Sequence, residues 1–234
     1  VSVTQKQQMA IIFLGMFMAF LIILNYLPLD ITFDKALEIA GASGKMEILD
    51  FSFDFENRYT FWSGMIGGTF LMLSYFGTDQ SQVQRYLSGK SVKQSQMGLI
   101  MNGLLKVPMQ FFILLVGVMV FVFYQFNASP LHFNPAAVKD VMQSEYASKC
   151  TALEEEKKGI DKTLNAAQLA YSQTTNTNKL AELRTEIAAL QQQEESLREQ
   201  SKAVIKKANP EAETNDKDYV FIHFILPNLP RGLI

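Results

Sequence analysis

Three long apolar runs, separated from one another by charged residues, most constrain what this sequence can fold into. They cover about residues 9–27, 60–78 and 97–126 of the 234. Each is close to the roughly 20 residues that a helix needs to cross a hydrocarbon layer about 30 Å thick. Because lipid offers no hydrogen-bond partner to an open backbone, we expect three membrane-spanning helices. The alternative, buried helices of a soluble protein, is disfavoured by the charged segments between the runs.

The composition changes sharply along the chain. Residues 9–126 hold nearly all the Phe, Met and Ile, whereas residues 138–219 contain no Phe or Trp and are rich in Ala, Gln, Glu and Lys. We therefore predict a membrane region over 1–137, an extramembrane insertion with its linker over 138–218, and the start of another membrane element over 219–234. The net charge of −2 gives no sign of a nucleic-acid partner. Because the sequence begins without Met and ends inside an apolar run, we expect a fragment of a longer protein.

The charges between the runs predict the orientation. The segment between the first two runs is mainly acidic, while the short segment between the second and third carries Arg85, Lys90 and Lys93 against Asp79. Lys6 precedes the first run. Short loops rich in Lys and Arg stay on the cytoplasmic side. We expect the insertion at 138–218 to lie on the outer face.

Polar residues inside the second and third runs are candidates for function. Tyr75 lies near the inner end of the second run, and Lys106 lies within the third beside Pro108. A cation within a span is unfavourable by about 2.5–3.5 kcal/mol on insertion scales, so it usually marks function. The alternatives are hydrogen bonding between helices without solute contact and, for Lys106, extension of the ammonium to the membrane surface.

The insertion has a heptad pattern in two parts, separated by the polar turn 174–178. Positions spaced by four and three carry Tyr146, Cys150, Leu153, Lys157, Ile160, Leu164, Ala167 and Tyr171, then Leu180, Leu183, Ile187, Leu190, Glu194, Leu197, Ser201 and Val204. This pattern predicts an antiparallel coiled-coil hairpin. Folding at the turn places Lys157 opposite Glu194, and we expect this pair to fix the register. The hairpin is either a passive insertion or a docking surface for a partner or a second copy.

The residue types typical of enzymes do not form a recognisable pattern. His132 and His223 have no metal-ligand partner at useful spacing, and Cys150 is the only cysteine. The sequence also lacks a glycine-rich phosphate loop and a nucleophile elbow. We expect no catalytic residues.

Several of these motifs resemble those of the sodium/solute symporter family, whose members include the sodium/glucose cotransporters. The resemblance rests on Tyr75-Phe76-Gly77-Thr78-Asp79-Gln80, Val83-Gln84-Arg85, Gly103-Leu104-Leu105-Lys106-Val107-Pro108 and Leu229-Pro230-Arg231-Gly232-Leu233. It covers about residues 1–137 and 219–234. It implies an all-α membrane protein, here a fragment of a leucine-transporter-type inverted-repeat fold. The three spans would be core helices five, six and seven, and the coiled-coil hairpin would be inserted before helix eight.

The same resemblance implies roles for individual residues. Tyr75 would cover the solute and Lys106 would bind it, so these two are the substrate-binding candidates. Asp79, Gln80 and Arg85 would stabilise the cytoplasmic end. The ligands of the co-transported sodium ion would lie mostly on helices one and eight, outside this sequence. Met72 stands where sugar carriers can have Asn, and its thioether lacks the hydrogen bonds of an amide, which puts monosaccharide transport in question.

These observations lead to two functional expectations. The first is a sodium-coupled symporter that moves a small polar solute by alternating access, embedded in the lipid of a plasma membrane or bacterial inner membrane. The alternative is a membrane sensor or assembly platform that uses the hairpin to bind a protein partner. The expected partners of the first are lipid, sodium and the solute, with no nucleic acid.

Overall fold

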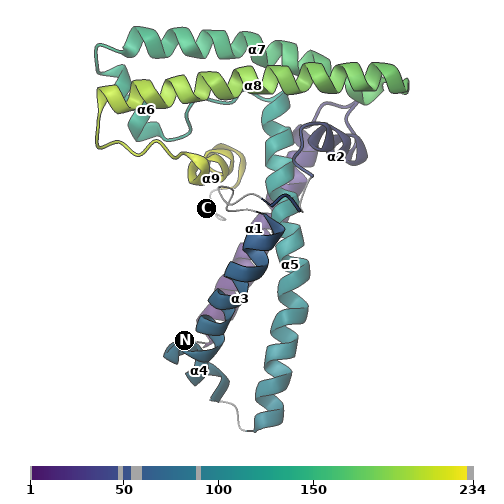
Figure 1. Ribbon diagram of the computed structural model, residues 1–234, viewed down its shortest axis with the longest axis vertical. Coiled ribbons are helices and arrows are strands. Elements are labelled where there is room, and N and C mark those ends of the chain that lie inside the picture. The colour runs from purple at the N-terminus through teal and green to yellow at the C-terminus, as the bar shows by residue number, and fades with distance from the viewer. Residues whose placement is uncertain (1, 47–49, 54–59, 88–90, 231–234) are drawn as a thin grey trace. The chain divides into compact units, whose positions relative to one another are not determined.

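The computed structural model in Figure 1 is all-helical in the residues it describes, which are 2–46, 50–53, 60–87 and 91–230, without the side chains of 2, 3, 5, 6, 82 and 85–87. The helices are α1 (Ser2–Tyr26), α2 (Phe33–Ala42), α3 (Phe61–Gly77), α4 (Gln80–Leu87), α5 (Val92–Phe126), α6 (Pro135–Met142), α7 (Ala147–Gln173), α8 (Thr177–Ala208) and α9 (Lys217–Asn228). The expectation of an all-α chain is therefore confirmed. No strand occurs in these ranges.

The chain divides into two compact units. One comprises Val1–Met46 with Leu115–Ile234, and the other comprises Glu47–Leu114. Helix α5 contributes its last residues to the first unit and the rest to the second.

The unit Glu47–Leu114 contains α3, α4 and most of α5. Thr60 begins α3 with a reciprocal cap: its Oγ1 accepts from the Ser63 amide at 3.3 Å, and Ser63 Oγ accepts from the Thr60 amide at 3.2 Å. None of the residues of α3 is buried within the structure, although nearly all of its side chains are apolar. An apolar surface of this extent requires lipid or other helices around it.

Two helices among the described residues are long and apolar enough to cross a membrane, Gln7–Tyr26 within α1 and Val92–Phe126, which is α5. They coincide with the first and third predicted spans. Helix α3 coincides with the second, but its 17 residues rise only about 25 Å at 1.5 Å each. That α3 also crosses the membrane stays a prediction, and so do the domain boundaries.

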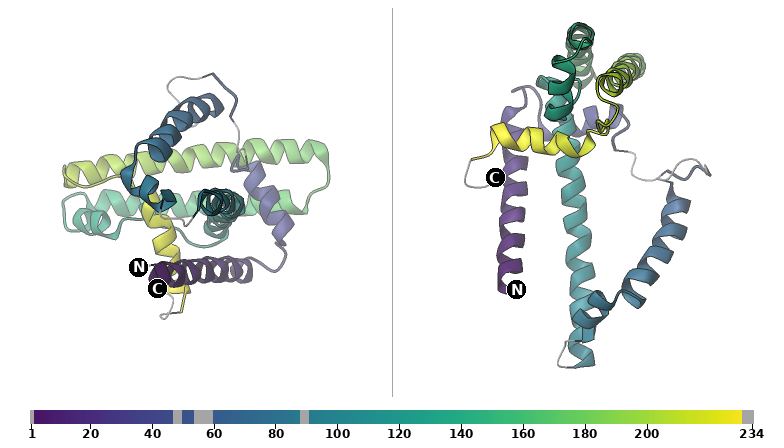
Figure 2. Two further views of the ribbon diagram at one scale, coloured as in Figure 1. Left: turned by 90° about the horizontal axis from the view of Figure 1, so that it is seen from below. Right: turned by 90° about the vertical axis from the view of Figure 1, so that its left-hand side faces the viewer.

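The unit formed by residues 1–46 and 115–234 is dominated by the long helices α7 and α8, which run antiparallel and side by side (Figures 1 and 2). Most of the predicted heptad positions are buried, including Leu153, Leu164, Ile187 and Leu197. Leu164 and Ile187 share one apolar cluster, and Leu153 and Leu197 share another. The pairing of layers follows the sequence pattern, while supercoiling of the two helices stays a prediction.

The turn between α7 and α8 is shorter than the predicted 174–178. Helix α8 begins at Thr177 because the Asn176 side chain caps it, accepting from the amides of Asn178 at 3.0 Å and Lys179 at 3.4 Å. An Asn cap satisfies two of the amides that lack helical partners at this end. The last two residues of the predicted turn are therefore the first of the helix.

The hairpin formed by α7 and α8 packs on further elements of its unit. Helix α6 packs against both, α2 packs against α7, and α1 contacts α9. The buried apolar cluster of α6, α7 and α8 includes Leu131, which follows α5. The hairpin is thus attached to the end of α5 and is no free projection.

Candidate functional site

The predicted solute-binding residues lie on α3 and α5 of the unit Glu47–Leu114. Tyr75 is 38% exposed, and its ring meets the Phe76 ring edge to face, with the ring centroids 5.1 Å apart. Lys106 is exposed on α5. In the described part of this unit Lys106 forms no ion pair, and Tyr75 and Lys106 do not share a hydrogen bond. Their joint role in binding stays a prediction.

The predicted cytoplasmic-end residues follow α3 directly. Asp79 Oδ1 accepts from the Ser81 amide at 2.9 Å and from Ser81 Oγ at 2.7 Å, so its carboxylate caps α4. Gln80 is the first residue of α4 and is exposed. Arg85 belongs to the same helix, and its side chain lies outside the described residues.

Lys157 and Glu194 meet across the hairpin, with Nζ and Oε1 3.5 Å apart. Lys157 is only 2% exposed, and it has two closer partners: Asp161 Oδ2 at 2.6 Å and Ser129 Oγ at 2.8 Å. Arg198 donates to Glu194 Oε1 from both Nε and Nη2 at 3.1 Å. Two cations and two carboxylates thus form one polar cluster. That Lys157 and Glu194 set the register stays a prediction.

Within this cluster, desolvation is the largest influence on the Asp161 carboxyl. Burial raises the pKa of the Asp161 carboxyl above its ordinary value, against the opposing effect of the Lys157 ammonium that donates to it. A carboxylate removed from water favours its neutral form, and a nearby cation offsets this only in part. A buried charge that loses its partner is therefore costly here.

The segment that follows α5 is held by contacts from both helices of the hairpin and from the start of α9. Arg198 donates to the Leu131 carbonyl at 3.2 Å and lies over the Phe133 ring at 5.4 Å. Asp216 Oδ2 accepts from the Phe133 amide at 2.8 Å. Gln168, which is fully buried, donates from Nε2 to Gln125 Oε1 at 2.6 Å. These bonds fix residues 125–133 against the hairpin.

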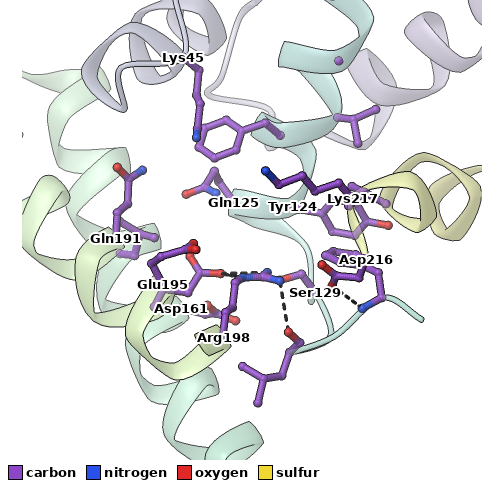
Figure 3. Close-up of a pocket in the computed structure, with 18 of the residues that line it drawn as sticks. Lys45, Tyr124, Gln125, Ser129, Asp161, Gln191, Glu195, Arg198, Asp216 and Lys217 are labelled. Atoms are coloured by element: carbon purple, nitrogen blue, oxygen red, sulfur yellow. Dashed lines mark hydrogen bonds and ion pairs between the residues drawn. The ribbon is translucent and has the colours of Figure 1, made fainter. Parts of the chain in front are cut away.

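A cavity of about 360 Å³ lies above the polar cluster (Figure 3). Its walls come from the end of α5, the segment after it, α7, α8, the start of α9 and Lys45. We name it the hairpin cavity, and its polar lining includes Lys45, Gln125, Ser129, Asp161, Gln191, Glu194, Glu195, Arg198, Lys202, Asp216 and Lys217. Its volume suits a small molecule.

Sequence reasoning missed most of this cavity. Asp161 and Arg198 could have been found, because each stands four residues after a charged heptad residue, the spacing of neighbours on a helix. Ser129, Gln125 and Lys217 carried no such signal, because their neighbours in the cavity come from distant parts of the sequence. Among the described residues, no group of three or more His, Cys, Asp or Glu side chains could hold a metal ion.

The described residues form helices without strands, and two of these helices are long and apolar enough to cross a membrane, which fits the class of all-α membrane proteins. No protein-family model matches it, and no solved structure matches it. Curated relatives do match part of it. The sodium/iodide cotransporter of Homo sapiens is 36% identical over 92 residues, which is 38% of this chain and 14% of the cotransporter.

Two further relatives agree with the first. Sodium-coupled monocarboxylate transporter 2 of Mus musculus is 41% identical over 70 residues, covering 30% of this chain and 11% of that protein. The sodium-dependent multivitamin transporter of Oryctolagus cuniculus is 33% identical over 95 residues, covering 39% of this chain and 14% of that protein. All three are sodium/solute symporters, so the resemblance to this family is confirmed.

The matches span no more than about a seventh of the length of these relatives. The named relatives are transporters, in agreement with the expectation that the chain is not an enzyme. They give no support to a sensor or assembly platform.

Proposed function

We propose that this chain works within a sodium-coupled symporter that carries a small polar solute across the membrane by alternating access. The observation that carries the proposal is its 33–41% identity to three carriers whose names state sodium dependence or coupling. Sodium is then the co-transported ion, with its ligands mostly outside these residues. The fold would be the leucine-transporter type, in which paired repeats enclose a site near the middle of the membrane.

Within this proposal, the three apolar helices are core helices five, six and seven. Lys106 contacts the solute, and Tyr75 covers it from the cytoplasmic side. The hairpin of α7 and α8 lies on the outer face as an insertion before helix eight. Lysine suits a solute with an oxygen-rich or anionic group, because its ammonium offers three donors and no acceptor.

The test is uptake by the full-length protein reconstituted into liposomes. The solutes are iodide, pyruvate as a monocarboxylate, a water-soluble vitamin and glucose, each with an inward gradient of sodium or of N-methylglucamine. We expect sodium to accelerate uptake of at least one of the first three. Uptake of none of the four solutes above the N-methylglucamine background would overturn the proposal.

The role of Lys106 is tested in the same liposomes with Lys106→Ala, and Lys149→Ala serves as a control because Lys149 is an exposed lysine of the hairpin. We expect Lys106→Ala to abolish uptake while the protein is recovered in the liposomes in normal amount. Normal uptake kinetics in this variant would remove Lys106 from the solute site.

A further inference from the structure

The hairpin cavity has a polar floor in which the charges already have partners. Asp161 accepts from Lys157, and Glu194 accepts from Arg198 and lies beside Lys157. Asp216 accepts from a backbone amide. The charges of Asp161 and Glu194 are therefore compensated by Lys157 and Arg198.

The upper part of the cavity is different, because three nitrogen donors converge there. Figure 3 shows the side chains of Lys45 and Lys217 directed toward Gln125 from two sides of the cavity. In the described structure neither lysine forms an ion pair. Lys45 instead lies over the Phe121 ring, with Nζ 5.2 Å from the ring centre.

Gln125 supplies the third donor, and a buried neighbour determines its orientation. Its Oε1 accepts from Gln168 Nε2 at 2.6 Å, so the Nε2 group of Gln125 remains to donate elsewhere. Gln168 is fully buried, and its own Oε1 has no hydrogen-bond partner among the described residues. A buried amide left partly unsatisfied is unfavourable. Gln168 acts here as a positioning residue for Gln125.

Two lining carboxylates, Glu195 and Asp216, have no ion pair in the described structure, and both interact electrostatically with Lys202. Lys202 donates to Glu199 at 2.6 Å. The acidic side chains that face Lys202 are therefore partly compensated by its positive charge. The donors around Gln125, which are the two lysine ammonium groups and the Gln125 amide, have no such opposite charge paired with them among the described residues. Three donors that lack an acceptor fit an anion.

We propose that the hairpin cavity binds a small carboxylate anion between the ammonium groups of Lys45 and Lys217 and the amide of Gln125. The aliphatic part of the anion lies against Phe121 and Tyr124, which also line the cavity. As a first binding position for the transported solute on the outer face, the site rests on the proposed function. As an anion site it stands on the geometry alone.

The test uses trifluoroacetate as the probe, with the full chain in a neutral detergent and a sodium-free, low-chloride buffer. The ¹⁹F linewidth of trifluoroacetate reports binding, and acetate is the competitor. Trifluoroacetamide is a neutral molecule of the same shape. We expect the protein to broaden the trifluoroacetate signal, acetate to reverse the broadening, and trifluoroacetamide to remain sharp.

The variant Lys45→Gln with Lys217→Gln should lower trifluoroacetate affinity about tenfold, because charge-assisted hydrogen bonds are lost. Its matched control is Lys149→Gln with Lys179→Gln, which removes the same charge from exposed sites of the hairpin. Gln125→Glu should abolish binding by placing a negative charge among the donors. Equal affinities in the two double variants, or equal broadening of the neutral amide, would overturn the proposal.

The two proposals fail separately. If sodium-driven uptake occurs but the Lys45/Lys217 variant binds trifluoroacetate normally, the anion site is wrong and the symporter stands. If binding depends on the two lysines but no solute is taken up, the anion site stands and the symporter is wrong. Helical circular dichroism equal to wild type confirms that both double variants are folded.

Discussion

The phenol oxygen of Tyr124 lies 2.7 Å from Nδ1 of His223, which joins the end of α5 to α9. The rings of Phe123 and Phe224 meet beside this bond, with centroids 4.9 Å apart. The hairpin lies between these two points of the sequence, so the chain leaves α5 and returns to α9 at neighbouring positions. Such closeness of the two ends agrees with the prediction that the hairpin is an insertion, because inserted segments are tolerated where their ends lie close together.

Removing the buried cation of the hairpin should be strongly destabilising. We expect Lys157→Met to lower the free energy of unfolding by about 3 kcal/mol, because Asp161 and Glu194 lose the charge that compensates them. Thermal melting of the full chain in detergent, followed by far-ultraviolet circular dichroism, measures the change. The control is Lys158→Met, since Lys158 pairs with Glu155 in full contact with solvent and should leave the melting temperature nearly unchanged. Equal melting temperatures in both variants would contradict the role given to Lys157.

The stability of the chain should depend on pH through Asp161. Burial raises the pKa of its carboxyl, so in acid the folded state binds this proton more readily than the unfolded state does. The contribution is fully present below the ordinary value of 3.8 and is lost as pH rises through the higher folded pKa. We expect the melting temperature of wild type, relative to Asp161→Asn, to rise as pH falls through that window. A constant difference between the two proteins would show that Asp161 does not titrate in this way.

The apolar layers of the hairpin should be essential to its fold. Ile187 is fully buried between α7 and α8, so Ile187→Ala should reduce stability by about 2–5 kcal/mol through lost burial and a residual cavity. Leu190→Ala is the comparison, because Leu190 is only partly buried beside the same cluster. The measurement is chemical unfolding of the full chain in detergent. A larger loss for Leu190→Ala than for Ile187→Ala would contradict the packing described above.

The proposed orientation places the hairpin and the loop before α5 on opposite sides of the membrane. Gln193 and Ser91 are exposed, and each can be replaced by cysteine in a Cys150→Ser background. In intact cells we expect a membrane-impermeant maleimide to label Gln193→Cys and to label Ser91→Cys only after permeabilisation. Labelling of both sites from outside would refute the orientation.

Much of the fold follows from local patterns in the sequence. Apolar runs located α1, α3 and α5, and heptad spacing located the hairpin and placed Lys157 opposite Glu194, which lies 3.5 Å away. The surroundings of that pair were not predictable. Ser129 reaches Lys157 across 28 residues, and Gln125 reaches Gln168 across 43, and no period in the sequence encodes contacts of this range.

The attachment of the hairpin to residues 125–133 has a practical consequence for following motion. Because Lys157, Gln168 and Arg198 hold that segment, a rotation of the end of α5 is passed on to α8, whose 32 residues extend about 48 Å. A spin label on the exposed side of α8 would lie far from the axis of that rotation and would move a correspondingly large distance. Small rotations of a helix would then be read as large changes in distance.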